Sequence, residues 1–267
     1  MELDAYLECI GFAGRPEADL ATLKQIHRQH LLTIPFENLD VQLGRKVDLD
    51  IGRIYKKLVE QGRGGWCYEM NGLLGWALRQ IGFEVMRMAG GVWRARRGDA
   101  VLGNHLLLCV QLDRPWVADV GFGDGMFEPV PLEAHGFEQR GFSYRLEQVG
   151  EYWRFHNHSG GTGESYDFRL TPADEALLAE RSGWLGSAPE SPFVMNLTVQ
   201  KFVPHGYDIQ VGRVAKQVTP RGKREWLIDS ADELLEALSD RFGIDVPEVA
   251  GLWDGIAARH EALFGQE

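Results

Sequence analysis

The spacing of apolar positions predicts that the chain begins as a helical domain. Apolar side chains recur every three or four residues over 20–31 and again over 51–58, which is the period of one helix face. Pro35 interrupts the first pattern. A further helix is predicted over 66–80, because Gly82 follows it as a typical C-terminal stop. Residues 1–82 are therefore assigned to a helical domain.

The period changes after Gly82, where short apolar runs are separated by turn signals. These runs predict strands over 85–88, 91–93, 105–112, 116–120, 142–146 and 152–155. Many short strands in succession are typical of a barrel or sandwich, so residues 83–188 are assigned to a β domain. Within 189–267, alternation over 193–203 and 207–218 precedes two helical patterns, which predicts a mixed α/β domain. The predicted fold class is α+β.

The composition is that of a globular protein. Of the 267 residues, 25% are charged and 44% are apolar, which excludes disorder, collagen-like repeats and membrane bundles. The net charge of −11 argues against nucleic acid as the main partner, because the phosphate backbone favours clustered Lys and Arg. The short basic run at 94–97 suits a small anionic ligand at most. No stretch approaches the roughly 20 apolar residues of a membrane span, so no membrane partner is expected.

The cysteines suggest a reducing environment. Cys9, Cys67 and Cys109 form no CxxC pair and no even-numbered framework, so neither a disulfide scaffold nor a thiolate zinc site is predicted. The N-terminal residues have no basic segment followed by an apolar run, and we therefore expect no secretory signal. Together these features predict a cytoplasmic location.

Three other polar motifs carry weak functional signals. The segment 157–163 is glycine-rich but lacks the Gly-Lys-Ser/Thr ending of a phosphate loop, so we interpret it as a hairpin or flexible loop. Two histidine pairs have a spacing that superficially resembles metal ligands: His27 with His30, and His156 with His158. No cysteine or acidic set completes either pair, so no metal is expected.

Cys67 is the strongest candidate for a nucleophile. It follows Arg63, Gly64 and Gly65 closely and lies in the predicted first turn of a helix. Free backbone N–H groups and the positive end of the helix dipole stabilise a thiolate at such a position. The two glycines allow close approach of a substrate. The alternative is that Cys67 is a small core residue.

A cysteine nucleophile requires a base and an orienting carboxylate, and the β domain offers both. His105 opens an apolar strand and Asp119 interrupts the next one, where a carboxylate needs a partner. The connection between these strands is short enough to predict a hairpin, and a three-residue loop at 113–115 or a bulge would place both side chains on one face. Each residue alone is also compatible with a structural role.

The order Cys67, His105, Asp119 is that of papain-like and transglutaminase-like enzymes. Four segments make the resemblance more specific: IPFENL at 34–39, RGGWC at 63–67, NHL at 104–106 and DVGFG at 119–123. With them the chain resembles the arylamine N-acetyltransferase family over its first half. The resemblance implies an N-terminal helical bundle, a central antiparallel β-barrel and a C-terminal α/β lid around a papain/transglutaminase-like Cys-His-Asp core.

The resemblance also implies a reaction. Cys67 would take an acetyl group from acetyl-CoA as a thioester and pass it to an arylamine, an arylhydrazine or an N-hydroxyarylamine in a ping-pong sequence. His105 would hold Cys67 as a thiolate–imidazolium pair and move the proton of the incoming amine, and Asp119 would orient and stabilise the imidazole. Acetyl-CoA is thus the expected donor, and no metal is needed.

Binding residues follow from the same resemblance. The acceptor pocket is expected to include Phe36, Val92, Phe122 and Phe193. The coenzyme is expected to contact Gly121, Phe122, Gly123 and Trp93. The apolar members are also compatible with a core role, Val92 and Phe193 above all. Arg63, Glu37 and Asn38 are interpreted as structural residues that tie the helical domain to the loop before Cys67.

Two other enzyme classes remain open at this point. An amide synthase that closes a macrocycle uses the same motifs, and a cysteine hydrolase would pass the acyl group to water through the same three residues. A non-catalytic binding module is disfavoured because all three residue types are present. The sequence does not determine the oligomeric state, and a homodimer is compatible with it.

Overall fold

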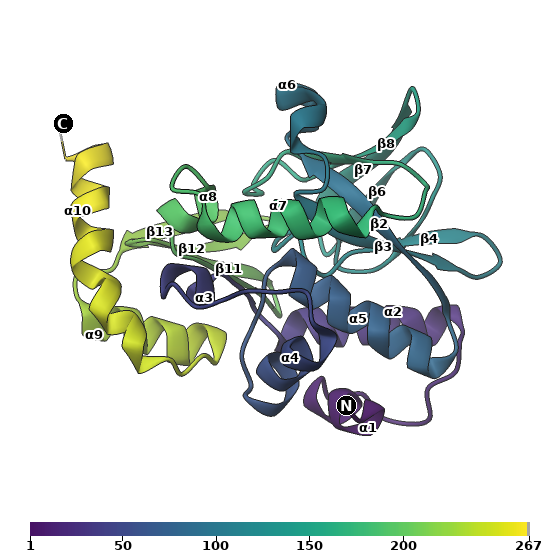
Figure 1. Ribbon diagram of the computed structural model, residues 1–267, viewed down its shortest axis with the longest axis horizontal. Helices are drawn as coiled ribbons and strands as arrows, with labels where there is room; N and C mark the ends of the chain where they lie inside the picture. Colours follow the sequence, from purple (N-terminus) through teal and green to yellow (C-terminus); the bar gives the residue numbers. More distant parts are fainter. Residues whose placement is uncertain (266–267) are drawn as a thin grey trace.

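The computed structural model describes residues 1–265, and its N-terminal helices lie in the lower half of the view in Figure 1. They are α1 (Leu3–Cys9), α2 (Leu20–Thr33), α3 (Leu39–Gln42), α4 (Ile51–Tyr55), the π-helix η1 (Lys56–Glu60) and α5 (Cys67–Ile81). The side chain of Asp19 accepts the N–H of Thr22 at the start of α2. Gly82 ends α5 in the left-handed conformation, with φ 109°, as its position in the sequence predicts.

Eight antiparallel strands form the central sheet. They are β2 (Glu84–Val92), β3 (His105–Gln111), β4 (Pro115–Ala118), β5 (Val130–Pro131), β6 (His135–Gln139), β7 (Phe142–Val149), β8 (Tyr152–His156) and β9 (Ser165–Phe168). Their order is β5-β4-β3-β2-β9-β8-β7-β6. The edge strands do not pair with each other among residues 1–265, so the predicted antiparallel β-barrel is an open half-barrel. β5 has two residues, one of them a proline without an N–H, and cannot supply the ladder that closure needs.

The strand that precedes the hairpin differs from its prediction. Residues 85–88 and 91–93 were expected as separate strands, but β2 is continuous and ends at Val92. Trp93 adopts a positive φ of 68° and leaves the sheet. It begins the short helix α6 (Arg94–Arg97), which is followed by the 3₁₀ helix η2 (Gly98–Val101).

A second, five-stranded sheet contains one strand from the N-terminal part of the chain and four strands from the C-terminal part. Its strands are β1 (Phe36–Glu37), β10 (Thr198–Val203), β11 (Gly206–Val211), β12 (Val214–Thr219) and β13 (Gly222–Leu227), in that spatial order. The strand predicted over 193–203 begins only at Thr198, because Pro192–Met195 forms helix α8 with the hydroxyl of Ser191 as its cap. β13 was not predicted, since its residues are mostly charged and exposed.

The remaining helices are α7 (Glu175–Ser187), α9 (Ala231–Ala237), the π-helix η3 (Leu238–Phe242), the 3₁₀ helix η4 (Pro247–Leu252) and α10 (Trp253–Phe264). Figure 1 shows α7 crossing the face of the molecule toward α8 and the five-stranded sheet. The main hydrophobic core runs from Tyr6 to Val218 and includes residues of all three predicted domains. The division at 82/83 and 188/189 stays a prediction.

None of the helices in residues 1–265 combines the length and the apolar composition that crossing a bilayer requires.

Candidate active site

Cys67 is the first residue of α5 and is 3% exposed. The loop before it is packed against the segment that contains Pro35. The N–H of Gly65 donates to the carbonyl of Pro35 at 3.1 Å, and a Cβ at Gly64 would lie 2.2 Å from that oxygen. Gly64 is therefore required by the approach of two backbones. At Gly64 the contact with Pro35, rather than the predicted close approach of a substrate, explains the glycine.

Buried ion pairs hold this loop to the helical domain. Arg63 Nη2 lies 2.6 Å from Glu37 Oε1, and Lys57 Nζ lies 2.9 Å from Glu69 Oε2. Glu69 Oε2 also accepts the N–H of Trp66, directly before Cys67. Burial raises the pKa of Glu69 to about 7, although the Lys57 charge opposes this. The contacts agree with the structural role expected for Arg63 and Glu37.

The β3–β4 hairpin brings His105 and Asp119 together. Leu108 pairs with Ala118 and Gln111 with Pro115, so the loop has three residues, at 112–114, one position earlier than expected. This register places positions 105 and 119 on one face of the sheet. His105 Nε2 lies 2.8 Å from Asp119 Oδ2, and both side chains are almost fully buried.

Asp119 has a hydrogen-bond partner at each oxygen. Asn71 Nδ2 donates to Oδ1 at 2.8 Å, and the N–H of Gly121 donates to the same oxygen at 2.9 Å. Asn71 lies four residues after Cys67, on the same face of α5. The side-chain Oδ1 of Asn71 accepts the N–H of Val120 at 3.0 Å. Asn71 thus connects the helix that carries Cys67 to the segment that carries Asp119.

His27 supports the same segment from α2. Its Nε2 accepts the N–H of Asp119 at 3.1 Å, and its Nδ1 donates to the carbonyl of Phe127 at 3.0 Å. Burial lowers the pKa of His27 to about 4, so the ring is neutral at pH 7. Within residues 1–265 there is no group of three or more His, Cys, Asp or Glu side chains that could hold a metal ion.

The pKa values of His105 and Asp119 move in opposite directions. Burial alone would lower the pKa of His105, but the charge and hydrogen bond of Asp119, followed by those of Cys67, raise it to about 10. Burial would raise the pKa of Asp119, but the charge and hydrogen bond of His105 lower it overall. The pair therefore exists as imidazolium and carboxylate at neutral pH.

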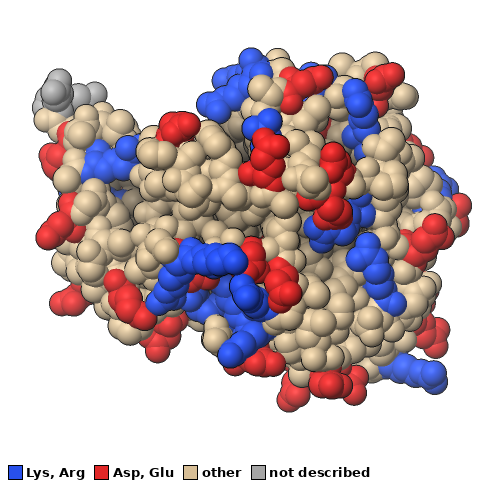
Figure 2. Space-filling model, viewed as in Figure 1, with Lys and Arg blue, Asp and Glu red and all other residues tan. Residues whose placement is uncertain are grey.

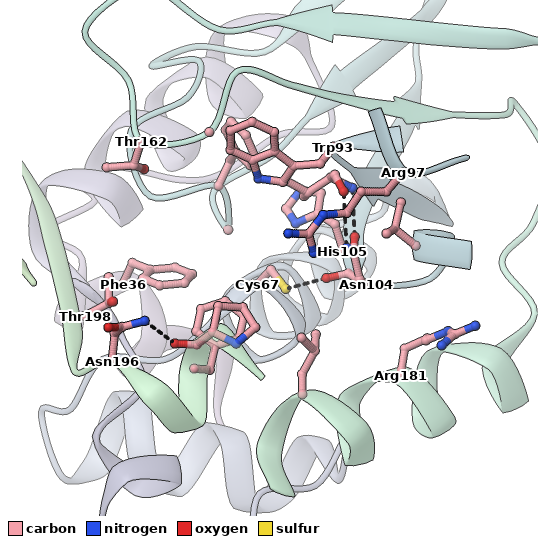
Figure 3. A pocket seen from close by; sticks show the side chains of 18 of the residues that line it. Phe36, Cys67, Trp93, Arg97, Asn104, His105, Thr162, Arg181, Asn196 and Thr198 are labelled. Carbon is pink, nitrogen blue, oxygen red and sulfur yellow. Dashed lines mark hydrogen bonds between the residues drawn. The ribbon is translucent and has the colours of Figure 1, made fainter. Parts of the chain in front are cut away.

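Cys67 lies beside this pair. Cys67 and His105 line the same cavity, and Cys67 contributes to the raised pKa of the imidazole. Because Nε2 is bound to Asp119, Nδ1 is the ring nitrogen that is free for the thiol. In Figure 3 the sulfur of Cys67 lies beside His105 at the centre of a cavity, with the carbonyl of Asn104 4.0 Å from the sulfur.

The cavity has a volume of about 530 Å³ and contains most of the predicted binding residues. Those that line it are Phe36, Val92, Trp93, Gly121, Phe122 and Phe193. Gly123 is not among the lining residues, because the side chain of Gln200 occupies the space beside it, 1.7 Å from where a Cβ would be. Gly121 packs closely against Cys67, because a Cβ added at position 121 would lie 2.6 Å from Cys67 Cα.

The cavity lining is basic although the chain is acidic. Arg97 and Arg181 line it, whereas no Asp or Glu belongs to the lining within residues 1–265. Neither arginine forms an ion pair with another described residue, whereas Arg94 pairs with Asp167 and Arg96 pairs with Glu164. Figure 2 shows the basic group around α6 at the top of this face. Such a lining favours an anionic ligand.

The chain is similar to known proteins over most of its length. A family model described as N-acetyltransferase matches residues 19–250. The arylamine N-acetyltransferase of Mycolicibacterium smegmatis is 39% identical over 262 residues, which cover 94% of each chain. The solved structure of the Mycobacterium marinum arylamine N-acetyltransferase in complex with CoA has a TM-score of 0.87 at 30% identity, covering 97% of this chain and 98% of that one. The chain belongs to the arylamine N-acetyltransferase family.

Membership of the arylamine N-acetyltransferase family confirms the resemblance seen in the four motifs, and it identifies the chain as an acetyltransferase. The Escherichia coli (strain K12) enzyme of the same name is 34% identical over 214 residues, which cover 76% of this chain and 74% of that one. The mixed fold of helices and sheets is the one found in solved structures of the family.

Sequence reasoning missed several residues of this arylamine N-acetyltransferase site. Asn71 carried a usable signal, because a polar residue four positions from Cys67 in an apolar helix lies on the same face. His27 was considered only as a metal ligand. Arg181 and Trp184 line the cavity from α7, and no local pattern indicates that α7 covers the site.

Proposed function

We propose that this chain transfers an acetyl group from acetyl-CoA, through a thioester on Cys67, to arylamines, arylhydrazines or N-hydroxyarylamines. The observation that carries the proposal is the contiguous set of Cys67, His105 and Asp119 at the wall of an aromatic-lined cavity. The family and the basic lining support acetyl-CoA as the donor, since a relative's structure contains CoA.

In the first half-reaction the Cys67 thiolate attacks the acetyl carbonyl carbon. His105 holds the thiol proton as an imidazolium, which the Asp119 carboxylate stabilises. The new sulfur–carbon bond forms, the bond to the coenzyme sulfur breaks, and His105 returns the proton to the leaving thiolate. The first-turn amides of α5, at Cys67 and Tyr68, have no acceptor within the helix and are suited to receive the negative oxygen.

In the second half-reaction the amine nitrogen attacks the thioester carbon. His105, now neutral, takes a proton from the amine as the carbon–nitrogen bond forms. The bond to Cys67 breaks, and the thiolate–imidazolium pair is restored. Atoms and charge balance without a metal or a redox partner.

The cavity suits an aromatic acceptor. Phe36 and Phe193 lie with ring centroids 6.1 Å apart, and Phe122 lies 5.6 Å from the His105 ring. These rings offer stacking surfaces beside the sulfur. Gly123 lies outside the cavity lining and is not proposed as a coenzyme contact. The acceptor contacts of Phe36, Val92, Phe122 and Phe193, and the coenzyme contacts of Gly121, Phe122 and Trp93, remain part of this proposal. So do a homodimer and a cytoplasmic location.

Release of the coenzyme thiol tests the proposal against its alternatives. With acetyl-CoA and a panel of anilines and hydrazines, we expect thiol release that depends on the acceptor and yields the acetylated amine. Release at the same rate without an acceptor would instead indicate a cysteine hydrolase. A macrocycle-forming amide synthase would leave simple anilines unacetylated and act on a long acyl chain that carries its own amine.

A further inference from the structure

Asp124 is buried without a cationic partner. Among the other buried carboxylates, Glu37, Glu69, Asp119, Asp167 and Asp208 each lie within 4 Å of a basic side chain. Asp124 is 0% exposed and forms no ion pair with any residue of the described chain. Burial raises its pKa to about 6, and its hydrogen bonds only partly oppose this. Burying a carboxylate without a counter-charge costs free energy of folding. The hydrogen bonds that Asp124 accepts must offset part of this cost, and they indicate what the residue does.

Those hydrogen bonds hold the glycine-rich segment 157–163. Asn157 Nδ2 donates to Asp124 Oδ1 at 2.9 Å, and the N–H of Thr162 donates to Oδ2 at 2.6 Å. The segment joins β8 to β9 and is closed by the N–H of Asn157 bonding to the carbonyl of Glu164. One carboxylate therefore binds both ends of the loop.

The same loop forms a wall of the cavity. Thr162 and Gly163 line it, and a Cβ at Gly163 would lie 2.7 Å from Phe122 Cζ, so the loop backbone rests on the Phe122 ring. Gln200 Nε2 donates to Thr162 Oγ1 at 3.0 Å and connects the loop to β10. Figure 3 shows Thr162 above Phe36, across the cavity from Arg181.

Phe122 and Asp124 are positioned by a single tight turn. The N–H of Asp124 donates to the carbonyl of Phe122 at 3.0 Å, and Gly123 between them has φ 81°, a conformation that favours glycine. The turn directs the Phe122 ring toward the cavity and the Asp124 carboxylate toward the loop. Asp124 itself is not among the residues that line the cavity, so it contacts this wall only through the loop and the turn.

We propose that Asp124 is a positioning residue that sets acceptor specificity, because it holds loop 157–163 against Phe122 and so limits the size of the aromatic acceptor. The proposal rests on the proposed function, since it concerns the second half-reaction. Asp124 contacts none of Cys67, His105 and Asp119 through a hydrogen bond in the described chain, so acetylation of the cysteine is expected to be independent of it.

Asp124→Asn tests this with a nearly isosteric change. The asparagine amide has one acceptor oxygen, whereas the Asp124 carboxylate has two. Either Asn157 or Thr162 therefore loses its hydrogen-bond acceptor, and loop 157–163 becomes more mobile. We expect the ratio of kcat/KM for a bicyclic arylamine to that for aniline to rise about tenfold, mainly through KM for the amine. The rate of Cys67 acetylation and the Tm should stay close to those of the wild type.

Two further variants make the test specific. Asp124→Asn combined with Asn157→Asp reverses the direction of the 124–157 hydrogen bond and keeps an acceptor for Thr162, so the wild-type ratio should return. Asp208→Asn is the matched control, because it neutralises a buried carboxylate that does not line the cavity and should leave the ratio unchanged. If Asp124→Asn does not fold, Asn157→Ala removes one donor and should raise the ratio in the same direction.

Hydrogen exchange gives an independent measurement. In Asp124→Asn we expect faster amide exchange confined to residues 157–164. An unchanged acceptor ratio in a variant whose loop exchanges faster would overturn the proposal, as would a double variant that fails to restore the ratio. If the wild-type protein acetylates no amine at all, the proposed function itself fails; if it does so and only the ratio is insensitive to Asp124, this inference alone fails.

Discussion

The proposed catalytic side chains and the rest of the cavity lining are held in different ways. Cys67, His105 and Asp119 are at most 3% exposed and lie on one helix and one hairpin, where Asn71 and His27 bind the Asp119 segment directly. Much of the remaining lining comes from α8, the loop 157–163 and α7, and several of its side chains are exposed, including Trp184 at 41%. The difference suggests that the chemistry is fixed by dense hydrogen bonding, whereas acceptor choice depends on parts that can change at little cost.

Loss of the nucleophile should have the largest effect. Cys67→Ala is expected to lower acetyl transfer by at least about 10⁴-fold, because no other group forms the thioester. Thermal unfolding should change little, since alanine fits the buried position. Cys109→Ala, in the buried part of β3, is the matched control and should retain transfer. Turnover in Cys67→Ala would contradict the account.

Asp119→Asn should have the second-largest effect. We expect kcat to fall by about 10³- to 10⁴-fold, as in triads whose imidazole loses its carboxylate. Without that charge, burial dominates and the pKa of His105 falls, so the ring is neutral at pH 7. NMR titration of the His105 ring would measure this. Asp113→Asn, an exposed carboxylate in the same hairpin, should leave the titration unchanged.

The same pair predicts a pH dependence of stability. Because folding raises the pKa of His105 from 6.5 to about 10, protonation stabilises the fold fully below pH 6.5, and this contribution is lost as the pH rises through about 10. Denaturant unfolding of the wild type and of Asp119→Asn should differ most near pH 6.5, the acid end of this range, and converge at the alkaline end. A constant difference at all pH values would speak against the ion pair.

Asn71→Ala should have an intermediate effect. It removes a donor from Asp119 and an acceptor from Val120, which costs about 1–3 kcal/mol of unfolding free energy for each buried group left unpaired. We expect kcat to fall about tenfold or more as Asp119 loses its orientation. Asn71→Asp would test orientation separately, because it keeps the acceptor and loses the donor. Activity at the wild-type level in Asn71→Ala would weaken the contrast between the two regions.

Changes in the wall should be smallest and should act on binding. Phe193→Ala removes an aromatic surface next to Phe36 and Trp66, so KM for the amine should rise by up to about tenfold while Cys67 acetylation continues at nearly the wild-type rate. Stopped-flow measurement of the two half-reactions separates these effects. An equal loss in the acetylation step would show that the wall is not separate from the chemistry.

The contrast also explains what could be predicted from the sequence. Cys67, His105 and Asp119 lie in local patterns, a glycine-preceded helix start and two strands joined by a short turn, and these patterns suffice to place them. Phe193 lies beside β10, which pairs with β1 across more than 160 positions of sequence, and Thr162 lies beside β9, which pairs with β2 across more than 70 positions. Periodicity contains no information on such pairing. The pattern of short strands predicts a barrel or sandwich, but it does not show that the sheet stays open, because the two-residue edge strand β5 has no local signal.

Intact-mass spectrometry with peptide mapping tests the central claim most directly. After mixing with acetyl-CoA and no acceptor, the account predicts a gain of about 42 Da, one acetyl group in an acyl-enzyme, located at Cys67 and removed when an arylamine is added. Cys109 serves as an internal control, since burial raises its pKa to about 11 and it should stay unmodified. Turnover of acetyl-CoA and arylamine by a protein that never carries an acetyl group on Cys67 would contradict the account.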